Sequence, residues 1–477
     1  AMGETERLFM NGYQTWTHCP ELGKQDKLRG LDGVPGFIRK HYGLDRYGDY
    51  FFVPYSGKKG QSHGFSYCYF RKGDTYRLIG SLDETPGYTI FGYDAQAGKL
   101  TVRRDCAGVR HPGGEFPAFD LFFAQGSEKQ VFDAWFAAMS CTARPAPRLT
   151  GYSSWYNRYQ NISAASVAED LEGYRQVLPK GSLFQIDDGW EPFVGDWMET
   201  DPKKFPDGLA PFVEQSHESG LLAGLWLAPF VCETKSKIYR EHPDWLLKID
   251  GQSWYCGCNW SGFYALDIDN PQVRRVFERV FDTWHFDLVK LDFLYAVAPF
   301  GNERESRAAR MGRAMKLLRQ WCGDKLILGC GVPLMPCFGV VDYCRIGCDV
   351  SLSWDDKWFM RLLHRERVST RQSIDNTVFR RQLNGRAFGN DPDVFLLREE
   401  NCQLTPEEKD KLSTANALFG NILLCSDNPA NYSPETMARF ARVQRIFAQA
   451  EKAEVQADGG IQLTYWLDGQ EEKQAIR

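Results

Sequence analysis

Hydrophobic and polar positions follow three different patterns along the chain, and the first change comes near residue 149. Residues 1–148 contain short apolar or alternating runs that are separated by glycine-rich turns. Short runs that end at such turns are typical of antiparallel β-strands. The pattern therefore predicts an N-terminal antiparallel β-sandwich over residues 1–148, closed by a proline-stiffened linker at 143–148. We expect its strands to include residues 50–53, 65–70 and 100–103.

After residue 149, compact apolar runs alternate with segments in which apolar residues recur every three or four positions. In the segment 273–284 the apolar residues share one helical face, and Pro271 suits the first turn of that helix. A doubly wound sheet would favour a glycine-rich phosphate loop after the first strand, but Gly151 is followed by Tyr-Ser-Ser-Trp. We therefore predict a (β/α)8 TIM barrel over residues 149–430. Its strands are expected at 151–155, 183–187, 222–226, 288–292, 326–330, 344–347, 386–389 and 422–425.

The last part of the chain, residues 431–477, has a third pattern. Residues 434–452 have helical periodicity, and 455–467 have the composition of a strand pair. This segment is therefore predicted to form a helix and a small C-terminal β-element.

Composition and charge narrow the classes of partner. The net charge of −5 provides no basic field for nucleic acid or an anionic membrane. The longest apolar stretch, 221–231, is too short to cross a bilayer. The fourteen cysteines lack the spacing of a disulfide scaffold, so we expect reduced thiols and a cytoplasmic protein. Eight histidines without an HxH or HExxH motif make a metal site unexpected.

Charged residues lie at the ends of most predicted barrel strands, where TIM-barrel enzymes place their chemistry. Carboxylates in these positions, with few histidines, favour glycoside hydrolysis, which needs one ionised and one protonated carboxyl group. Asp292 fits the ionised nucleophile, because strand alternation places the Lys290 ammonium on the same side. Asp349 follows an apolar run that would keep a carboxylic acid neutral. Each aspartate alone is equally well explained as a helix N-cap, but the set that includes Arg345 is not.

Two further groups near the strand ends suit a sugar. Asp187 and Asp188 could accept hydrogen bonds from adjacent hydroxyls, with a metal site as the alternative. Aromatic side chains stack on the apolar face of a sugar ring, although core packing explains each of them equally well. The tryptophans at or just after strand ends are Trp155, Trp190, Trp197 and Trp226.

At these positions the sequence resembles the α-galactosidases of glycoside hydrolase family 36. The similarity has one match per strand in the right order, covers most of residues 151–430, and includes a loop at 11–16. The matching stretches are Trp155-Tyr156, 184–188, 224–230, 242–245, 264–267, 290–294, 328–331, 345–349 and 390–393.

The resemblance implies a retaining exo-α-galactosidase that needs no cofactor or metal ion and acts on a small oligosaccharide. It assigns Asp292 as nucleophile and Asp349 as general acid/base. The substrate-binding residues that it implies are Asp187 and Asp188 at the 4- and 6-hydroxyls, Lys290 and Arg345 at ring hydroxyls, Trp16, Trp155 and Trp226 around the pocket, and Cys330 and Gly347 beside the 2-substituent, where they would leave room.

Several alternatives stay open from the sequence. The same family includes α-N-acetylgalactosaminidases, α-galactosaminidases and galactosyl-transferring enzymes, and a sugar-binding protein without activity is a further candidate. Family members often form dimers or tetramers, so a homo-oligomer is expected by analogy. The N-terminal sandwich is expected to be shorter than in the family.

Overall fold

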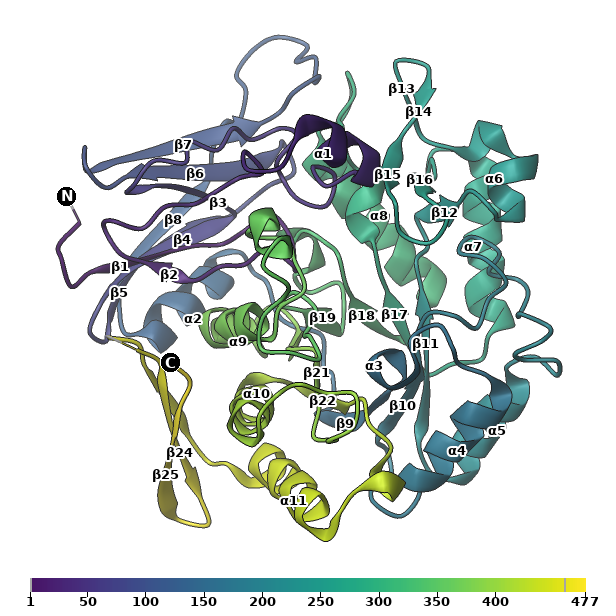
Figure 1. Ribbon diagram of the computed structural model, residues 1–477. Helices are drawn as coiled ribbons and strands as arrows, with labels where there is room; N and C mark the ends of the chain where they lie inside the picture. The colour runs from purple at the N-terminus through teal and green to yellow at the C-terminus, as the bar shows by residue number, and fades with distance from the viewer. Residues whose placement is uncertain (1, 459) are drawn as a thin grey trace.

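The computed structural model describes residues 2–458 and 460–477 and consists of a β-rich N-terminal part, a parallel barrel and a small C-terminal sheet (Figure 1). The N-terminal part has two antiparallel sheets, of order β2-β1-β4-β5-β8 and β3-β6-β7. Their strands are β1 (Arg7–Met10), β2 (Glu21–Leu22), β3 (Gln61–Phe65), β4 (Tyr67–Lys72), β5 (Thr75–Ser81), β6 (Tyr88–Asp94), β7 (Lys99–Asp105) and β8 (Leu121–Gly126).

Side-chain alternation along β4 explains why nearly all of this strand is buried. Cys68 and Phe70 join the small core that includes Phe91 of the second sheet. Tyr67 and Tyr69 point to the opposite face and join the main core of the molecule. They pack there on helix α2 (Glu128–Ala138), whose Phe132 ring lies 5.9 Å from that of Tyr67. The two faces of the first sheet therefore pack against different cores, one within the sandwich and one shared with the barrel.

Two of the predicted N-terminal strands differ in the structure. Residues 50–53 form a turn, with the backbone N–H of Val53 donating to the Asp49 carbonyl at 2.8 Å, so this prediction is wrong. The aromatic run is buried without a sheet because it packs against the barrel, where the Arg307 guanidinium lies 4.0 Å from the Phe52 ring. The predicted strand 65–70 is split at Ser66, whose φ of 67° sends β3 and β4 into different sheets.

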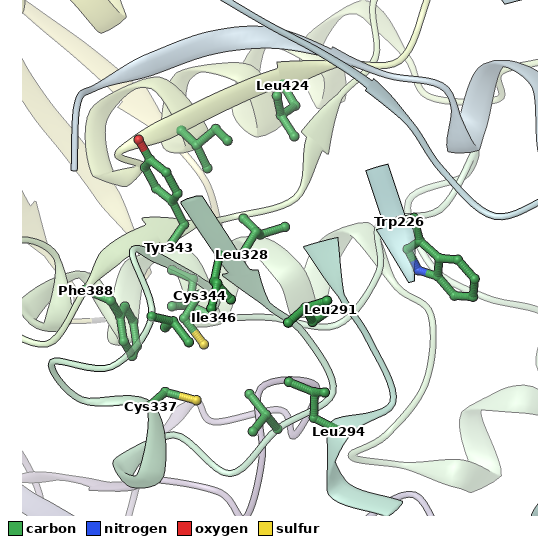
Figure 2. Packing of buried hydrophobic residues seen from close by; sticks show 14 of the residues in the cluster. Trp226, Leu291, Leu294, Leu328, Cys337, Tyr343, Cys344, Ile346, Phe388 and Leu424 are labelled. Atoms are coloured by element: carbon green, nitrogen blue, oxygen red, sulfur yellow. The ribbon is translucent and has the colours of Figure 1, made fainter. Parts of the chain in front are cut away.

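The barrel is a parallel sheet of order β20-β19-β18-β17-β11-β10-β9-β22-β21 in the described part of the chain. Chain-order neighbours pair around it, and β22 returns to β9, so the predicted TIM-barrel fold is confirmed. Figure 2 shows part of the buried packing, with Leu291 and Leu328 on adjacent strands. The strands are β9 (Leu149–Ser153), β10 (Leu183–Ile186), β11 (Leu222–Leu227), β17 (Leu288–Leu291), β18 (Leu326–Gly329), β19 (Tyr343–Arg345), β20 (Gly389–Asp391), β21 (Val394–Phe395) and β22 (Ile422–Cys425).

The seventh barrel position was predicted three residues too early and is interrupted. The strand begins at Gly389 as β20, stops at Pro392 and Asp393, and resumes as β21. Asp393 has a φ of 74°, and proline cannot donate a ladder hydrogen bond, so the strand breaks at this pair. The break turns the Asp393 carboxylate toward Arg345 on β19, with 2.9 Å between the charged groups.

Helices cover the outside of the barrel between most strands. They are α4 (Ala164–Tyr174), α5 (Ala210–Glu218), α7 (Pro271–Thr283), α8 (Arg307–Cys322), α9 (Thr370–Phe379), α10 (Pro406–Phe419) and α11 (Pro434–Gln449). Helix α7 begins at Pro271, as predicted. The β18–β19 connection has only the 3-10 turn η3 (Met335–Cys337). Helix α2 of the N-terminal part covers this gap, with the Phe136 ring 5.3 Å from that of Phe338.

A three-stranded antiparallel sheet ends the chain and lies beside the N-terminal part (Figure 1). Its strands are β23 (Ala453–Gln456), β24 (Gln462–Leu467) and β25 (Gln470–Ala475), one more than the predicted pair. Asp458, next to β23, pairs with Arg71 of β4 at 3.3 Å. None of the helices among the described residues combines the length and apolarity needed to cross a membrane.

Arg380, directly after α9, fastens the N-terminal segment 11–16 to the barrel. Its guanidinium is fully buried and donates to the carbonyls of Thr15 at 2.7 Å, Gln14 at 3.2 Å and Ile346 at 2.8 Å, and to the Asn11 side chain at 3.1 Å. These bonds compensate the cost of burying the charge and fix the loop over the end of β19.

Replacing Arg380 with Met should lower the free energy of unfolding by about 3 kcal/mol, because several buried carbonyl groups would lose their donor. Urea denaturation of the wild type and the variant would measure this change. Arg445→Met is the matched control, since Arg445 pairs with Asp468 in a half-exposed bridge at 3.2 Å and should contribute less than about 1 kcal/mol. Equal losses in the two variants would contradict the anchoring role of Arg380.

Candidate active site

A cavity of about 920 Å³ opens at the carboxyl ends of the barrel strands. TIM-barrel enzymes bind their substrates at this end. Its floor contains charged side chains from different strand ends. Those among the predicted site residues are Asp187, Asp188, Lys290, Asp292, Arg345 and Asp349, and the predicted tryptophans Trp16, Trp155 and Trp226 also line it.

Asp292 is held rigidly at the end of β17. Its backbone N–H still donates to the Leu227 carbonyl of β11 at 2.8 Å, so the residue continues the sheet. Phe293 then adopts a left-handed φ of 53°, which turns the chain sharply. The Phe293 N–H donates to Asp292 Oδ1 at 2.8 Å, and the Trp226 indole N–H donates to Oδ2 at 3.1 Å. Each carboxylate oxygen therefore accepts a hydrogen bond, which fixes the orientation of the Asp292 side chain.

Lys290 forms its ion pair with Asp187 and not with Asp292. The Lys290 Nζ lies 2.9 Å from Asp187 Oδ2, which also accepts from the Gln185 side-chain amide at 2.9 Å. Burial acts to lower the pKa of the lysine ammonium, but the Asp187 and Asp292 carboxylates outweigh it and raise the pKa. Lys290 therefore stays positively charged between the two aspartates, and its charge reaches Asp292 without a direct contact.

Asp188 lines the cavity with its side chain almost fully buried. Its Oδ2 accepts from the Gln160 amide and from the Trp260 indole N–H, both at 2.8 Å. Burial raises the pKa of Asp188, and the neighbouring buried Glu191, whose pKa is raised well above its usual value, contributes a hydrogen bond. Asp188 is consequently held in one orientation with acceptor capacity toward the cavity.

Asp349 differs from Asp292 in its environment. Burial raises the pKa of Asp349 to about 6, although the Arg345 guanidinium, 2.8 Å from Oδ1, acts to lower it. The side chain lines the cavity and keeps 38% of its surface exposed. Arg345 is shared with Asp391 at 3.0 Å and Asp393 at 2.9 Å, so its charge is divided among three carboxylates. Asp349 therefore holds its proton to a higher pH than an ordinary aspartate does.

Trp16 reaches the cavity from the N-terminal segment. Its ring lies 5.3 Å from Phe293 and 5.8 Å from Tyr295, both edge-on. Gly331, with φ of 56°, permits this approach, because a Cβ there would lie 2.9 Å from the Trp16 ring. The Gly331 N–H donates to Thr15 Oγ1 at 3.0 Å, which seats the loop against the barrel.

Four of the residues that the sequence singled out do not line the cavity. Trp190 and Trp197 are buried in the core, the former donating to the Trp226 carbonyl at 3.0 Å. Cys330 is buried and is not among the lining residues. Gly347 faces helix α9, where a Cβ would lie 3.3 Å from Asn376 Cβ, so helix α9 occupies the space that this glycine was expected to leave beside the substrate.

Sequence reasoning missed other residues of the site. Gln160 and Trp260 hold Asp188 but lie in loops away from the predicted strand ends, so strand periodicity could not identify them. Tyr156 and Asp393 lie in segments that the family resemblance covers. The Tyr156 hydroxyl donates to Asp393 Oδ2 at 2.7 Å, and both residues line the cavity beside Arg345. The Asn390-Asp391-Pro392-Asp393 motif, which resembles the family, is the feature of the sequence that could have identified Asp393 as a site residue.

Comparisons with known proteins agree with this geometry. The Melibiase family model matches residues 157–317. An α-galactosidase of Lactobacillus acidophilus is 35% identical over 121 residues, and one of Escherichia coli is 29% identical over 183 residues. These matches cover 23% and 35% of this chain, and only 16% and 25% of the relatives' own length.

The structural similarity extends over nearly the whole chain. An α-galactosidase from Thermus thermophilus in complex with p-nitrophenyl α-D-galactopyranoside has a TM-score of 0.76 and 26% identity. That match covers 98% of this chain and 90% of the other. The family 36 α-galactosidase AgaA from Geobacillus stearothermophilus has a TM-score of 0.62 at 14% identity over 97% of this chain and 67% of its own, which shows a shared fold.

The resemblance to family 36 α-galactosidases is confirmed. Within this barrel, the two aspartates that follow β17 and β19 have different surroundings: Asp292 accepts hydrogen bonds from two N–H donors, whereas burial raises the pKa of Asp349. Two carboxyl groups whose environments separate their protonation states can perform nucleophilic and general acid chemistry on one bond.

Proposed function

We propose that this protein is a retaining, exo-acting α-galactosidase that removes terminal α-linked galactose from small oligosaccharides by double displacement. The observation that carries this proposal is the joint position of Asp292 and Asp349 on one cavity, the first with both oxygens hydrogen-bonded by N–H groups and the second with a pKa raised to about 6 by burial. The similarity to family 36 α-galactosidases supports the choice of sugar.

In the first step, an Asp292 oxygen attacks the anomeric carbon. The bond from that carbon to the leaving oxygen breaks, and Asp349 transfers its proton to this oxygen. The product is a β-galactosyl ester of Asp292. In the second step, the Asp349 carboxylate removes a proton from water, the water oxygen attacks the same carbon, and the ester bond to Asp292 breaks. Two inversions return the α configuration.

Recognition of the sugar falls to the groups around these two residues. Asp187 and Asp188 are oriented acceptors for sugar hydroxyls, and Lys290 is a donor beside them. Trp16 closes one side of the cavity from the N-terminal segment. An enclosed floor of this kind accepts the end of a chain more readily than its middle, which supports exo-action.

Time-resolved NMR with a panel of α-linked galactosides, N-acetylgalactosaminides and glucosides tests this function. We expect galactose to be released, with the α anomer appearing first and converting slowly to β. First appearance of β-galactose would mean inversion. Faster release of N-acetylgalactosamine would show that the protein is an α-N-acetylgalactosaminidase. Formation of longer oligosaccharides in preference to free galactose would show that it is a transglycosylase.

Replacing Asp188 with Ala should lower kcat/KM on an α-galactoside by about 100-fold, because a site built to hydrogen-bond hydroxyls loses an oriented charged acceptor. Steady-state kinetics on methyl α-galactoside would measure the change. Asp282→Ala, an exposed aspartate on helix α7, is the control and should leave kcat/KM as in the wild type. Unaltered kinetics in Asp188→Ala would show that this carboxylate does not bind the sugar.

We further propose that the protein acts in the cytoplasm. All fourteen cysteines are free thiols, and most of them are buried. Burial raises the pKa of several of these thiols, including Cys68 and Cys256, which keeps them unreactive. Free buried thiols are typical of proteins in a reducing compartment. Fractionation of the source cells followed by an activity assay would test this location.

A further inference from the structure

The cavity has a second section at its opening that differs chemically from its charged floor. Two segments contribute it: the stretch around helix α1 (Gly36–Tyr42) and the stretch around the 3-10 turn η4 (Met360–Leu363). We call this section the apolar mouth. It is defined by the side chains of Val34, Ile38, Tyr42, Phe359, Met360 and Leu362.

The two segments of the apolar mouth lie against each other, and helix α1 also contacts strand β15 (Tyr255–Gly257). A Cβ at Gly33 would lie 3.5 Å from Leu362 Cδ2, and the Tyr50 hydroxyl donates to the Leu363 carbonyl at 3.1 Å. The Tyr255 hydroxyl of strand β15 donates to the His41 carbonyl at 3.1 Å, and Figure 1 shows α1 beside β15. The mouth is therefore a continuous wall, built by two segments that are far apart in sequence.

The charged side chains within helix α1 and the turn η4 do not line the cavity, although Glu366 and Arg367, which follow η4, do. Arg39 and Lys40 of helix α1 and Arg361 of η4 are not among the side chains that line it, whereas their apolar neighbours are. The lining thus contains carboxylates, lysine and arginine at the floor, whereas helix α1 and the turn η4 contribute aliphatic and aromatic groups to it. This division is the arrangement expected for a ligand with a polar end and an apolar end.

Exposed apolar side chains gather at this opening. Among the described residues, ten large hydrophobic side chains are exposed. Four of them line the cavity, and Phe37 and Trp358, each 77% exposed, are sequence neighbours of lining residues. The four are Tyr42, Phe359, Leu362 and Val368. Soluble proteins rarely leave such groups clustered in water without a binding role.

A sugar ring would fit this section poorly. Its hydroxyls would lose water against Ile38, Met360 and Leu362 without gaining hydrogen-bond partners, which is unfavourable. An alkyl chain would instead remove apolar surface from water on both sides. The cavity volume of about 920 Å³ is near the upper end of small-molecule sites, ~300–1,000 Å³, so it has room for more than one ring.

We propose that the apolar mouth is an aglycone subsite, and that the substrates this enzyme hydrolyses most efficiently carry an alkyl or lipid group on the anomeric oxygen. This inference rests on the proposed α-galactosidase function and adds the chemistry of the leaving group. A second copy of the chain would also cover the exposed rings, but it would lie over the opening that leads to Asp349. Continuity with the reacting carboxyl groups therefore favours the aglycone.

The test compares two substrates that differ only in the alkyl chain, methyl and octyl α-D-galactopyranoside, with octyl galactoside kept below its micelle concentration. In the wild type we expect kcat/KM to be at least about tenfold higher for octyl galactoside, because several methylene groups leave water in the complex. In an Ile38→Ser/Leu362→Ser double variant, the octyl-to-methyl ratio should fall to near one.

Phe123→Ser is the matched control. Phe123 lies on β8, is 64% exposed, and is not among the cavity-lining residues, so the octyl-to-methyl ratio should stay at the wild-type value. Light scattering on the wild type and the double variant accompanies the kinetics. Dissociation of an oligomer by the double substitution would assign the apolar mouth to a subunit interface and overturn the aglycone proposal.

The kinetic outcomes separate this inference from the function on which it rests. If the wild type hydrolyses both galactosides with equal kcat/KM, or if the double variant keeps the wild-type ratio, the aglycone subsite is wrong and the α-galactosidase function stands. If the wild type hydrolyses neither galactoside, both proposals fall.

Discussion

Replacing Asp292 with alanine should reduce galactoside hydrolysis by roughly 10⁴-fold or more, because the group that forms the covalent intermediate is lost. The Trp226 and Phe293 N–H groups, which donate to this carboxylate at 3.1 and 2.8 Å, would then face an empty space on the β side of the anomeric carbon. Sodium azide is small enough to occupy that space. It should restore turnover of an activated aryl α-galactoside and form β-galactosyl azide.

Product analysis by NMR decides this prediction, since the configuration of the azide reports the face from which it attacked. Trp226→Phe is an informative companion, because it keeps the carboxylate and removes one of its donors; we expect a loss of about 10-fold to 100-fold and no azide product. Formation of α-galactosyl azide by Asp292→Ala, or activity near that of the wild type, would show that another residue is the nucleophile.

Much of the barrel could be predicted because its local and global signals agree. Short apolar runs such as 288–291 and 422–425 are best buried as strands, and the structure has them so. Pro271 marks the start of its helix in both sequence and structure. The aromatic run 50–53 has the composition of a strand but forms a turn. Its side chains pack against the distant barrel segment that contains Arg307 and not within a sheet. Such tertiary packing leaves no periodicity to detect.

The charged floor was predictable for a related reason. Parallel strands of a barrel end at one edge, so Asp187, Asp292 and Asp349 had to lie near each other once the strands were located. The choice of ion-pair partners was not predictable. Strand alternation placed Lys290 on the side of Asp292, yet Lys290 pairs with Asp187 on another strand, a choice that depends on barrel geometry.

The loop residues of the site could not be predicted from the sequence pattern. Trp260 donates to Asp188 from a turn between β15 and β16 (Phe263–Ala265), where its own φ is 56°. Neither the position of this turn nor its direction follows from periodicity, because an inserted sheet, and not the barrel, determines both. Gly347 shows the converse, since a small residue that suggested space beside the substrate instead permits close packing of helix α9.

Replacing Asp349 with alanine should produce a loss that depends on the leaving group. Protonation of the leaving oxygen contributes roughly 10²–10⁴-fold when that oxygen is basic, so turnover of methyl α-galactoside should fall by this factor. An aryl galactoside with a strongly acidic phenol needs no proton, and its first step should proceed almost as in the wild type. Steady-state and pre-steady-state kinetics on the two substrates would measure this difference.

The pH profile gives a second, independent test of the same variant. Because burial raises the pKa of Asp349 to about 6, and the acid must be protonated in the first step, kcat/KM of the wild type on methyl galactoside should fall as pH rises through about 6. In Asp349→Ala this alkaline limb should disappear. Asp356→Ala, in the same loop but outside the cavity lining, is the control and should keep the limb.

Azide should also distinguish Asp349 from Asp292. In Asp349→Ala the β-galactosyl ester of Asp292 still forms from the aryl substrate, and azide then attacks it from the α face, where the missing base would have activated water. The product should be α-galactosyl azide, opposite in configuration to that from Asp292→Ala. The same anomer from both variants would mean that the two carboxyl groups do not act on opposite faces of the anomeric carbon, and double displacement by this pair would be excluded.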